Sequence, residues 1–544
     1  RRRCGSRGLM ERPERPVERR PVERVRGTQD LWPGEALPLD TVRRGLELAF
    51  ARAGYRRVDV PVLEPAELHL RKSGLEIISK LYAFDDLGGR RLCLRPELTA
   101  SLVRAFVSQP APRLPAKVYS GGPVFRYERP SKGRYRQFTQ TGVELVGASG
   151  PLADAEVIAL AVDALEGLGL AGYRVTVGHV GILAELLAKL GLPGRLRGQL
   201  METLEPARRH GLAAARAQLR ELDPDLFDVA GHFEVAGHLD VAGADGVSVD
   251  GTLAPVPEPG PTGGTGGAPG DGSPRVRQAA SGLLGQLGAE SLGRRTAGEV
   301  LERLVRKQQP GPLRLAVERA LRFIEELSTI HGSPGSALDH GRRMVQAHGL
   351  DPAHLESLEQ TVRLAEDFGT PLDRLEIDLG LSRGLQYYTG MVFEIDHGDL
   401  GSESQLCGGG RYDDLFRALG ARQAIPALGF AFGVERVRLA LEAEKLLLPE
   451  PAQADVLVVP ATPEQAGYAG RVARHLRASG RRADLDVTGR PVRQALAYAN
   501  REGYPKVAIV GHENVQAQTV RLREMTGGQE RTMLLAELAA EGAP

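Results

Sequence analysis

The chain has 544 residues, 42% of them hydrophobic, which is enough for about three domains with ordinary buried cores. Its 70 lysines and arginines balance 69 aspartates and glutamates, so any contact with nucleic acid must come from local patches and not from a global basic field. Three separated cysteines, Cys4, Cys93 and Cys407, indicate neither a disulfide framework nor a zinc site. No apolar run is long enough to cross a membrane and no signal-peptide core is present, so the sequence predicts a cytoplasmic protein without a membrane partner.

The N-terminal part of the sequence divides into a charged extension and a folded region. Residues 1–24 are rich in Arg, Glu and Pro and lack periodic apolar positions, which predicts a disordered extension. Residues 25–181 form the next region. Within it, AGYRRVDVPVLEP at 53–65 indicates the end of a helix followed by a short strand that stops at Pro61. Cys93 lies in the apolar stretch RLCLRP, where a buried thiol is expected.

The segment FRYERPSKGRYRQFTQTGVE, at 125–144, combines arginines, aromatic residues and glutamates in a strand, loop and strand pattern. Arg126, Arg134 and Arg136 can each offer forked donors to phosphate or carboxylate oxygens. Phe138 offers a flat face for a nucleobase. The segment therefore predicts a polyphosphate site, and the alternative is a solvated hairpin with scattered ion pairs of little energetic value.

Residues 182–369 show a helical pattern, with apolar positions at spacings of three and four in LAELLAKLGL and ALRFIEELSTI. This range is predicted to be a helical insertion. Its segment 251–274 is rich in Gly and Pro and has almost nothing to pack, so we expect an exposed loop.

Residues 370–448 contain three further informative segments, which are LSRGLQYYTGMVFEI at 381–395, CGGGRYDDL at 407–415 and GFAFGVERVRLAL at 429–441. The last indicates a glycine-rich strand that runs into a helix beginning near Glu435. The glycines at 408–410 allow the backbone to approach a ligand closely.

The final region, residues 454–544, alternates between strand and helix signals. DVLVVP, RADLDV, KVAIVG and TVRLREM are typical of strands, and VRQALAYANREG is typical of a helix. Thr462, Pro463 and Gln465 mark a helix start and Gly480 a helix stop. This alternation predicts a small α/β domain.

The segments at 53–65, 125–144 and 429–441, in this order, resemble motifs 1, 2 and 3 of class II aminoacyl-tRNA synthetases. The segments at 381–395 and 407–415 are similar to the two signature peptides of the histidyl-tRNA synthetase family. The resemblance covers about 25–180 and 370–535 and implies an α+β fold: an antiparallel-sheet catalytic core with a helical insertion, followed by an α/β anticodon-binding domain. The residues that match motifs 1 to 3 are Gly54, Tyr55, Val58, Pro61, Arg126, Glu128, Phe138, Gly433, Glu435 and Arg436.

The resemblance implies a histidine–tRNA ligase. Such an enzyme activates L-histidine with ATP and Mg²⁺ to histidyl-adenylate and pyrophosphate, and then transfers histidine to the 3′ end of histidine tRNA. It also implies a homodimer, because motif 1 elements form the dimer interface in this class.

Activation requires positive charge where the transition state accumulates negative charge. By resemblance, Arg126 and Arg383 are catalytic and contact the α-phosphate and the substrate carboxylate from opposite sides. Arg136 is a less certain neighbour. No metal site made by the protein is expected, because magnesium is held mainly by phosphate oxygens. The residues implied to bind ATP are Arg126, Glu128, Arg134, Phe138 and Arg436.

Selection of histidine requires an acceptor for one imidazole N–H and a second group that fixes the other ring nitrogen. By resemblance, Glu144 and Tyr388 take these positions, whereas Tyr387 is expected to pack in the core. The other residues implied to bind histidine are Glu97, Thr99, Gln140 and Tyr412.

The chain departs from the family pattern at four positions near the site: Leu98 replaces Gly, Gln386 replaces Asp, Thr139 replaces His and Ser131 replaces Gln. Gln386 and Ser131 leave open an adenylate-forming paralogue that does not use tRNA. A second alternative is a protein like the regulatory subunit of ATP phosphoribosyltransferase, which typically lacks the C-terminal domain and has degraded motifs 2 and 3. The intact arginines at 126, 383 and 436 favour the ligase.

Overall fold

The computed structural model describes residues 21–71, 79–109, 112–222, 312–383, 387–448 and 454–538. The chain forms two compact units, the larger made mainly of Val42–Leu447 and the smaller of Leu448–Pro544 together with Leu31–Thr41. Most of the expected extension at 1–24, the Gly/Pro segment 251–274 and Gln386 lie outside the described residues.

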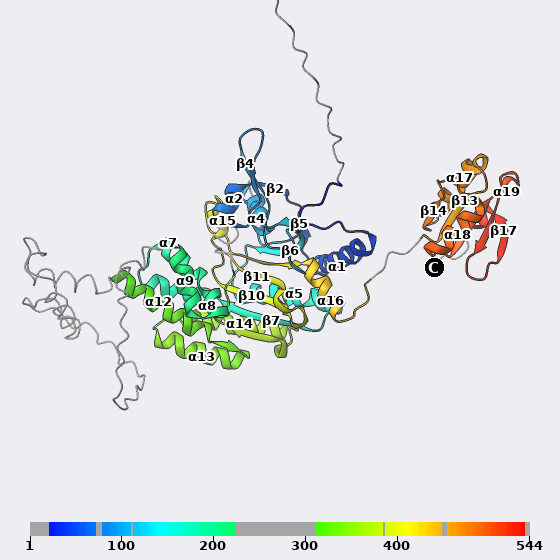
Figure 1. Ribbon diagram of the computed structural model, residues 1–544. Coiled ribbons are helices and arrows are strands. Elements are labelled where there is room, and N and C mark those ends of the chain that lie inside the picture. The colour runs from blue at the N-terminus through cyan, green and yellow to red at the C-terminus, as the bar shows by residue number, and fades with distance from the viewer. Residues whose placement is uncertain are drawn as a thin grey trace, which may run out of the picture. The chain divides into compact units, whose positions relative to one another are not determined.

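A nine-stranded sheet forms the centre of the larger unit (Figure 1). All neighbouring strands are antiparallel except the pairs β1–β5 and β7–β9. This confirms the expected α+β core with a largely antiparallel sheet. The strands, in spatial order, are β1 (Arg56–Arg57), β5 (Ala116–Phe125), β6 (Gln137–Val146), β12 (Ala427–Gly433), β11 (Gln405–Arg411), β10 (Met391–His397), β7 (Tyr173–His179), β9 (Leu375–Asp378) and β8 (His331–Gly332).

One face of this sheet is packed with aromatic side chains. Phe430 and Phe432 of β12 lie against Phe50 of helix α1 (Pro33–Arg52), with ring centroids 5.7 and 6.4 Å apart. Because side chains alternate between the two faces of a strand, the intervening positions of β12 lie on the opposite face. Those positions are occupied by small residues, which leaves that face open for a site: Gly429, Ala431 and Gly433.

The segment that resembles motif 1 forms one edge of this sheet through β1. Helix α1 ends at Arg52, β1 follows, and the chain turns at Pro61 into β2 (Leu63–Pro65). Strand β2 belongs to a separate three-stranded sheet of order β2-β4-β3, with β4 at Arg91–Leu94 and β3 at Ala83–Asp85. Helices α2 (Ala66–Leu70) and α4 (Thr99–Val107) flank it. Cys93 is fully buried in β4, as expected.

The described parts of 182–369 are mainly helical. Figure 1 shows α7, α8, α9 and α12 together on one side of the larger unit. Strand β8 also lies in this range, at the edge of the nine-stranded sheet, and α14 packs against α5 (Pro151–Glu166). The boundaries predicted for the insertion stay a prediction. The helices are α6 (Gly181–Lys189), α7 (Gly194–Glu202), α8 (Leu204–His210), α9 (Leu212–Leu222), α12 (Pro312–Ser328), α13 (Pro334–Ala347) and α14 (Ala353–Asp367).

Three short helices and α16 complete the larger unit. The 3₁₀ helices η4 (Leu372–Arg374) and η5 (Gly398–Glu403) precede β9 and β11. Helix α15 (Leu415–Ala418) follows β11. Helix α16 (Val434–Ala443) begins directly after β12, close to the start predicted at Glu435.

The smaller unit contains a five-stranded mixed sheet of order β14-β13-β15-β16-β17. The capping box of Thr462 and Gln465 starts η6 (Pro463–Gln465) and α17 (Ala466–Ala478), as the sequence predicts. This confirms the expected α/β domain. Its other elements are β13 (Val456–Pro460), β14 (Ala483–Leu485), α18 (Val492–Glu502), β15 (Lys506–Val510), α19 (His512–Ala517), β16 (Thr519–Glu524), β17 (Glu530–Leu534) and α20 (Leu535–Leu538).

A buried ion pair joins β11 to α5, and its removal should destabilise the fold. Arg411 Nη2 lies 2.6 Å from Asp154 Oδ1, with both side chains almost fully buried. Arg411→Ala leaves this carboxylate buried without its partner and is expected to lower the free energy of unfolding by about 3 kcal/mol. Urea unfolding followed by circular dichroism measures the change. Arg417→Ala, which removes an exposed pair with Asp414, is the control and should cost under about 1 kcal/mol; equal losses would contradict the prediction.

Candidate active site

A polar cavity of about 340 Å³ opens on the small-residue face of the nine-stranded sheet. The loop between β5 and β6, the start of α16, strands β10 and β11 and helix α8 all contribute to its wall. Six cationic side chains line it against four carboxylates, which suits a polyanionic ligand. The charged residues are Lys80, Arg126, Arg134, Arg209, Arg383, Arg436, Glu128, Glu205, Glu394 and Glu435.

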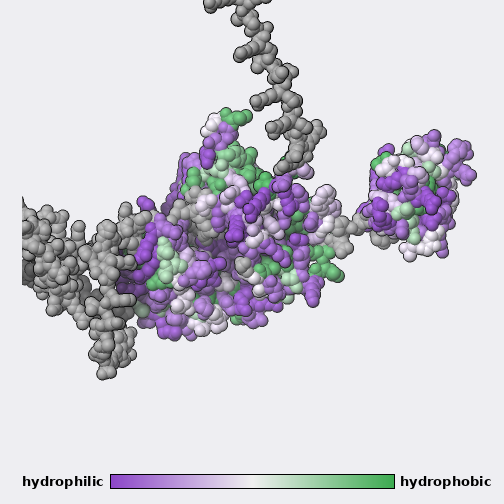
Figure 2. All heavy atoms as spheres, viewed as in Figure 1, coloured by the Kyte–Doolittle hydropathy of each residue, from purple (hydrophilic) through white to green (hydrophobic). Residues whose placement is uncertain are grey.

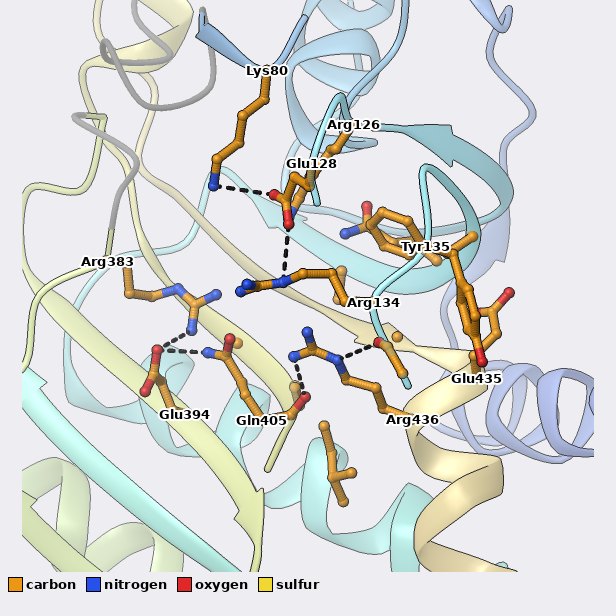
Figure 3. Close-up of a pocket in the computed structure, with 18 of the residues that line it drawn as sticks. Lys80, Arg126, Glu128, Arg134, Tyr135, Arg383, Glu394, Gln405, Glu435 and Arg436 are labelled. Atoms are coloured by element: carbon orange, nitrogen blue, oxygen red, sulfur yellow. Dashed lines mark hydrogen bonds and ion pairs between the residues drawn. The ribbon is translucent and has the colours of Figure 1, made fainter. Parts of the chain in front are cut away.

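The side chains of Arg134, Arg383 and Arg436 point into the same space from different elements (Figure 3). Arg134 is held by Glu128 at 3.0 Å and by Glu403 at 3.4 Å. Arg436 Nη2 lies 2.5 Å from Glu403, and its Nε donates to the carbonyl of Gly133 at 3.0 Å. Helix α16 is thereby fastened to the loop between β5 and β6, so the two motifs hold one another in place.

The carboxylate of Glu128 lies between two cations. Lys80 Nζ is 3.1 Å from Oε1 and Arg134 Nε is 3.0 Å from Oε2. Burial opposes ionisation, but Lys80 and the neighbouring arginines outweigh it and hold the pKa of Glu128 below its ordinary value. Glu128 is therefore ionised at neutral pH and can face a cation or a hydroxyl donor.

Arg126 links the cavity to the segment RPELTA. Its Nε donates to the carbonyl of Pro96 at 3.0 Å, and its guanidinium carbon lies 5.3 Å from the centre of the Phe138 ring. Glu435 accepts from the backbone N–H of Thr139 at 2.8 Å, which fixes the start of α16 against β6. In this part of the cavity wall, the guanidinium of Arg126 therefore lies next to the ring of Phe138.

Arg383 enters the cavity from the loop before β10. Its Nη1 lies 2.9 Å from Oε1 of Glu394, and its guanidinium rests over Gly408, where any Cβ would collide with it. The glycine predicted to admit a ligand thus also admits the side chain of Arg383. The space needed by this arginine explains glycine at that position.

A second group of predicted residues forms a buried cluster next to the cavity. The hydroxyl of Tyr412 donates a short hydrogen bond to Oε2 of Glu144, and Thr99 lies close enough to this carboxyl to influence its pKa. Burial raises the pKa of Glu144 to about 8. Oε2 occupies the space that a Cβ at Gly429 would take, so the glycine of β12 makes room for the carboxyl.

Glu97 and the two tyrosines complete this cluster. Glu97 accepts from the backbone N–H groups of Thr99 at 2.6 Å and Ala100 at 2.8 Å, so it fixes the start of α4. Burial raises its pKa. The rings of Tyr387 and Tyr388 are 4.8 Å apart, with Tyr387 in the core as expected and Tyr388 against Gly410.

The structure therefore brings the predicted residues together in two adjoining places. Glu97, Thr99, Glu144, Tyr388 and Tyr412 belong to the buried cluster. Those lining the cavity are Arg126, Glu128, Arg134, Phe138, Gln140, Arg383 and Arg436.

Arg136, which was predicted as a neighbour of the site, and Ser131, one of the departures from the family pattern, do not line the cavity. The guanidinium of Arg136 stacks on Tyr127 at 4.3 Å, outside the residues that line the cavity. The hydroxyl of Ser131 lies 3.4 Å from a carboxylate oxygen of Glu403.

The sequence did not single out several residues that line the cavity. Glu394 lies in the signature segment 381–395, so alternation along the strand could have pointed to it. Glu205 and Arg209 share one face of α8, but their spacing gives no sign of what that face meets. Lys80 and Gln405 carried no local signal.

The fold and the ordered motifs around this cavity define a class II aminoacyl-tRNA synthetase. The Histidyl-tRNA synthetase family model matches residues 27–245 and 279–437, and the Anticodon binding domain model matches 455–541. The chain belongs to the histidyl-tRNA synthetase family. It is accordingly an ATP-dependent ligase that joins histidine to tRNA, rather than a regulatory subunit or a paralogue without tRNA.

Similar proteins cover nearly the whole chain. The histidine–tRNA ligases of Thermococcus kodakarensis and Geobacillus kaustophilus are each 31% identical, over 94% of this chain and 96% of theirs. Among solved structures, Staphylococcus aureus histidyl-tRNA synthetase is 24% identical, with a TM-score of 0.57. The match covers 95% of this chain and 99% of that chain. A Bacillus halodurans protein, described as an ATP phosphoribosyltransferase regulatory subunit/histidyl-tRNA synthetase, is 21% identical over 90% and 99%, with a TM-score of 0.58. The last two likenesses show the fold alone.

The raised pKa of Glu144 predicts a dependence of stability on pH. An ordinary glutamate titrates near 4.5, so the folded state holds this proton more tightly, and stability is lost as pH rises from about 4.5 to about 8. Glu144→Gln removes the titration and should gain about 1.4 kcal/mol per pH unit relative to the unaltered protein in this window, and nothing more above it. Urea unfolding of both proteins at several pH values measures this difference in the free energy of unfolding. A difference that does not change with pH would contradict the raised pKa of Glu144.

Proposed function

We propose that Arg126 and Arg383 catalyse the activation of histidine in this cavity. A carboxylate oxygen of histidine attacks the α-phosphorus of ATP, and the bond to the β-phosphate oxygen breaks to release pyrophosphate. Arg126, on the side of Pro96, and Arg383, on the side of Glu394, would stabilise the negative charge that accumulates on the α-phosphate oxygens. The observation that carries this proposal is the convergence of Arg126, Arg134, Arg383 and Arg436 on one cavity beside the buried pair of Glu144 and Tyr412.

ATP would be held by the remaining charged groups of the cavity. Arg134 and Arg436 would bind the outer phosphates and Phe138 would stack on adenine, because all three line the cavity. The ionised carboxylate of Glu128 fits a magnesium ion that is held mainly by phosphate oxygens. Bound magnesium would neutralise phosphate charge. No cluster of three or more candidate metal-ligating side chains occurs among the described residues.

Histidine would bind in the buried cluster. Glu144 would accept an imidazole N–H and Tyr388 would contact the other ring nitrogen, while the hydroxyl of Tyr412 holds the carboxyl of Glu144. Glu97, Thr99 and Gln140 would supply acceptors for the α-amino group. The Oε1 atom of Gln140 is buried without a hydrogen-bond partner among the described residues, as expected for an atom that a ligand satisfies. Polar partners of this kind reject apolar analogues strongly.

Transfer to tRNA would follow in the same place, when a hydroxyl of the terminal ribose attacks the carbonyl carbon of the adenylate and AMP leaves. The smaller unit would bind the anticodon of histidine tRNA.

We further propose a cytoplasmic homodimer. Apolar surface lies over the three-stranded sheet and α2 (Figure 2), where four apolar side chains are exposed: Leu63 within the segment that resembles motif 1, Leu70, Phe84, and Leu87 in the turn between β3 and β4. Within the described residues, no helix is long and apolar enough to cross a membrane.

The first test is histidine-dependent exchange of pyrophosphate into ATP, followed by addition of histidine tRNA to the same preparation. Exchange followed by charging of the tRNA is expected. Exchange without charging would contradict tRNA as the acceptor, and a folded protein without exchange would contradict the activation step. Light scattering on this preparation should report twice the mass of one chain; a monomeric mass would contradict the homodimer.

The assignment of Glu144 predicts a selective loss. Glu144→Ala should raise the KM for histidine by at least about tenfold, because a buried acceptor for the imidazole is lost, while the KM for ATP changes little. Pyrophosphate exchange at varied histidine and ATP measures both constants. Glu128→Ala should show the opposite preference. Equal changes in both constants for Glu144→Ala would remove this residue from the amino-acid pocket.

A further inference from the structure

Glu394 on β10 lies at the border between two cavities. It lines the candidate active site, and it also lines a neighbouring open cavity of about 500 Å³ on the side of α8 and β9. From its contacts we infer that Glu394, held by Gln405, is the positioning residue that orients Arg383 for catalysis. This inference rests on the proposed catalytic role of Arg383.

The geometry is a three-membered chain of polar groups. Arg383 Nη1 is 2.9 Å from Glu394 Oε1, and the same oxygen accepts from Gln405 Nε2 at 2.5 Å (Figure 3). Arg383 Nη1 also lies 3.4 Å from the carbonyl of Phe393. Since the Arg383 and Glu394 side chains are only 16% and 12% exposed, solvent screens their attraction weakly.

The backbone leaves Arg383 little freedom. Glu394 pairs with Gly408 across β10 and β11, so the carboxylate and the floor under the guanidinium belong to one row of the sheet. Gly408 lies directly beneath the guanidinium. Only one edge of the fork is taken by Glu394, and Nε has no hydrogen-bond partner among the described residues. The other donors thus remain for the ligand.

Other arginines near Glu394 are committed elsewhere. Arg208 Nε lies 2.5 Å from Asp378 Oδ2, and Arg209 Nε lies 2.5 Å from Glu205 Oε1. Glu394 forms its ion pair with Arg383, although it lines both cavities. Arg208 and Arg209 thus have closer carboxylate partners of their own, and the close ion pair of Glu394 is with Arg383.

The arrangement has a mechanistic consequence. A long arginine side chain has many rotamers, and fixing one of them in advance lowers the entropy lost on reaching the transition state. Glu394 does not reach the reacting atoms in this proposal; it acts through Arg383. Its loss should therefore lower kcat more than it raises the KM of either substrate.

The test compares Glu394→Gln, Arg383→Ala and the double variant in pyrophosphate exchange, with the full-length chain. Glu394→Gln is expected to lower kcat by about 100-fold, the size of effect that a misplacement of about 1 Å produces, with little change in KM. In the Arg383→Ala background the same substitution should have no further effect. Glu376→Gln, the same change in the wall of the neighbouring cavity, is the control and should leave exchange unchanged.

Gln405→Ala tests the same arrangement without removing the ion pair, and decides the case if Glu394→Gln does not fold. It should lower kcat by about tenfold, again with no further effect when Arg383 is absent. Equal losses from Glu394→Gln with and without Arg383 would overturn the inference. A normal kcat in Glu394→Gln, or in Gln405→Ala if only that variant folds, would also overturn the inference, provided that Arg383→Ala is impaired. The proposed function would stand in that case. Normal exchange by Arg383→Ala would overturn both the catalytic role of Arg383 and the inference.

Discussion

The close approach of glycine backbone to functional side chains is the constraint on which the site depends. Gly408, Gly410 and Gly429 lie on neighbouring strands β11 and β12, and a Cβ at each would meet Arg383, Tyr388 or Glu144. Their pairing across the sheet puts Gly410 beside Gly429, and Gly429 beside Glu144. The floor of the site is therefore made of backbone, and the side chains from other elements lie directly on it. Larger residues on this face would fill the volume that the ligands require.

Electrostatic interactions determine how the charged side chains of the cavity wall are oriented above this glycine backbone. The arginines that face the cavity would repel one another in the absence of a ligand, and carboxylates such as Glu128, Glu394 and Glu403 separate them. These ion pairs are partly buried, so they orient side chains more than they add stability. A polyphosphate can then replace Glu403 as a partner of Arg134 and Arg436, and it can bind the free donors of Arg383 beside Glu394, without leaving any of these arginines uncompensated.

The two parts of the candidate site differ in polarity for a physical reason. The cavity is open and rich in ionised groups, which suits a hydrated polyanion such as a nucleotide. The adjoining cluster is buried, and burial raises the pKa of both Glu97 and Glu144. In such a buried environment each hydrogen bond to a small ligand contributes strongly to binding, because a polar group left without a partner there is poorly solvated and costs free energy.

The sequence by itself determined the family, the antiparallel α+β core and the C-terminal α/β unit, and it predicted seven of the residues that line the cavity. It could do so because motifs such as 125–144 and 407–415 are local: glycines, arginines and strand alternation at fixed spacing specify a loop or a strand directly. Only the tertiary structure decided that Glu394, Gln405, Lys80 and two residues of α8 join the same cavity. Their proximity arises from strand register and from helix packing between segments far apart in the chain, and no short stretch of sequence encodes either one.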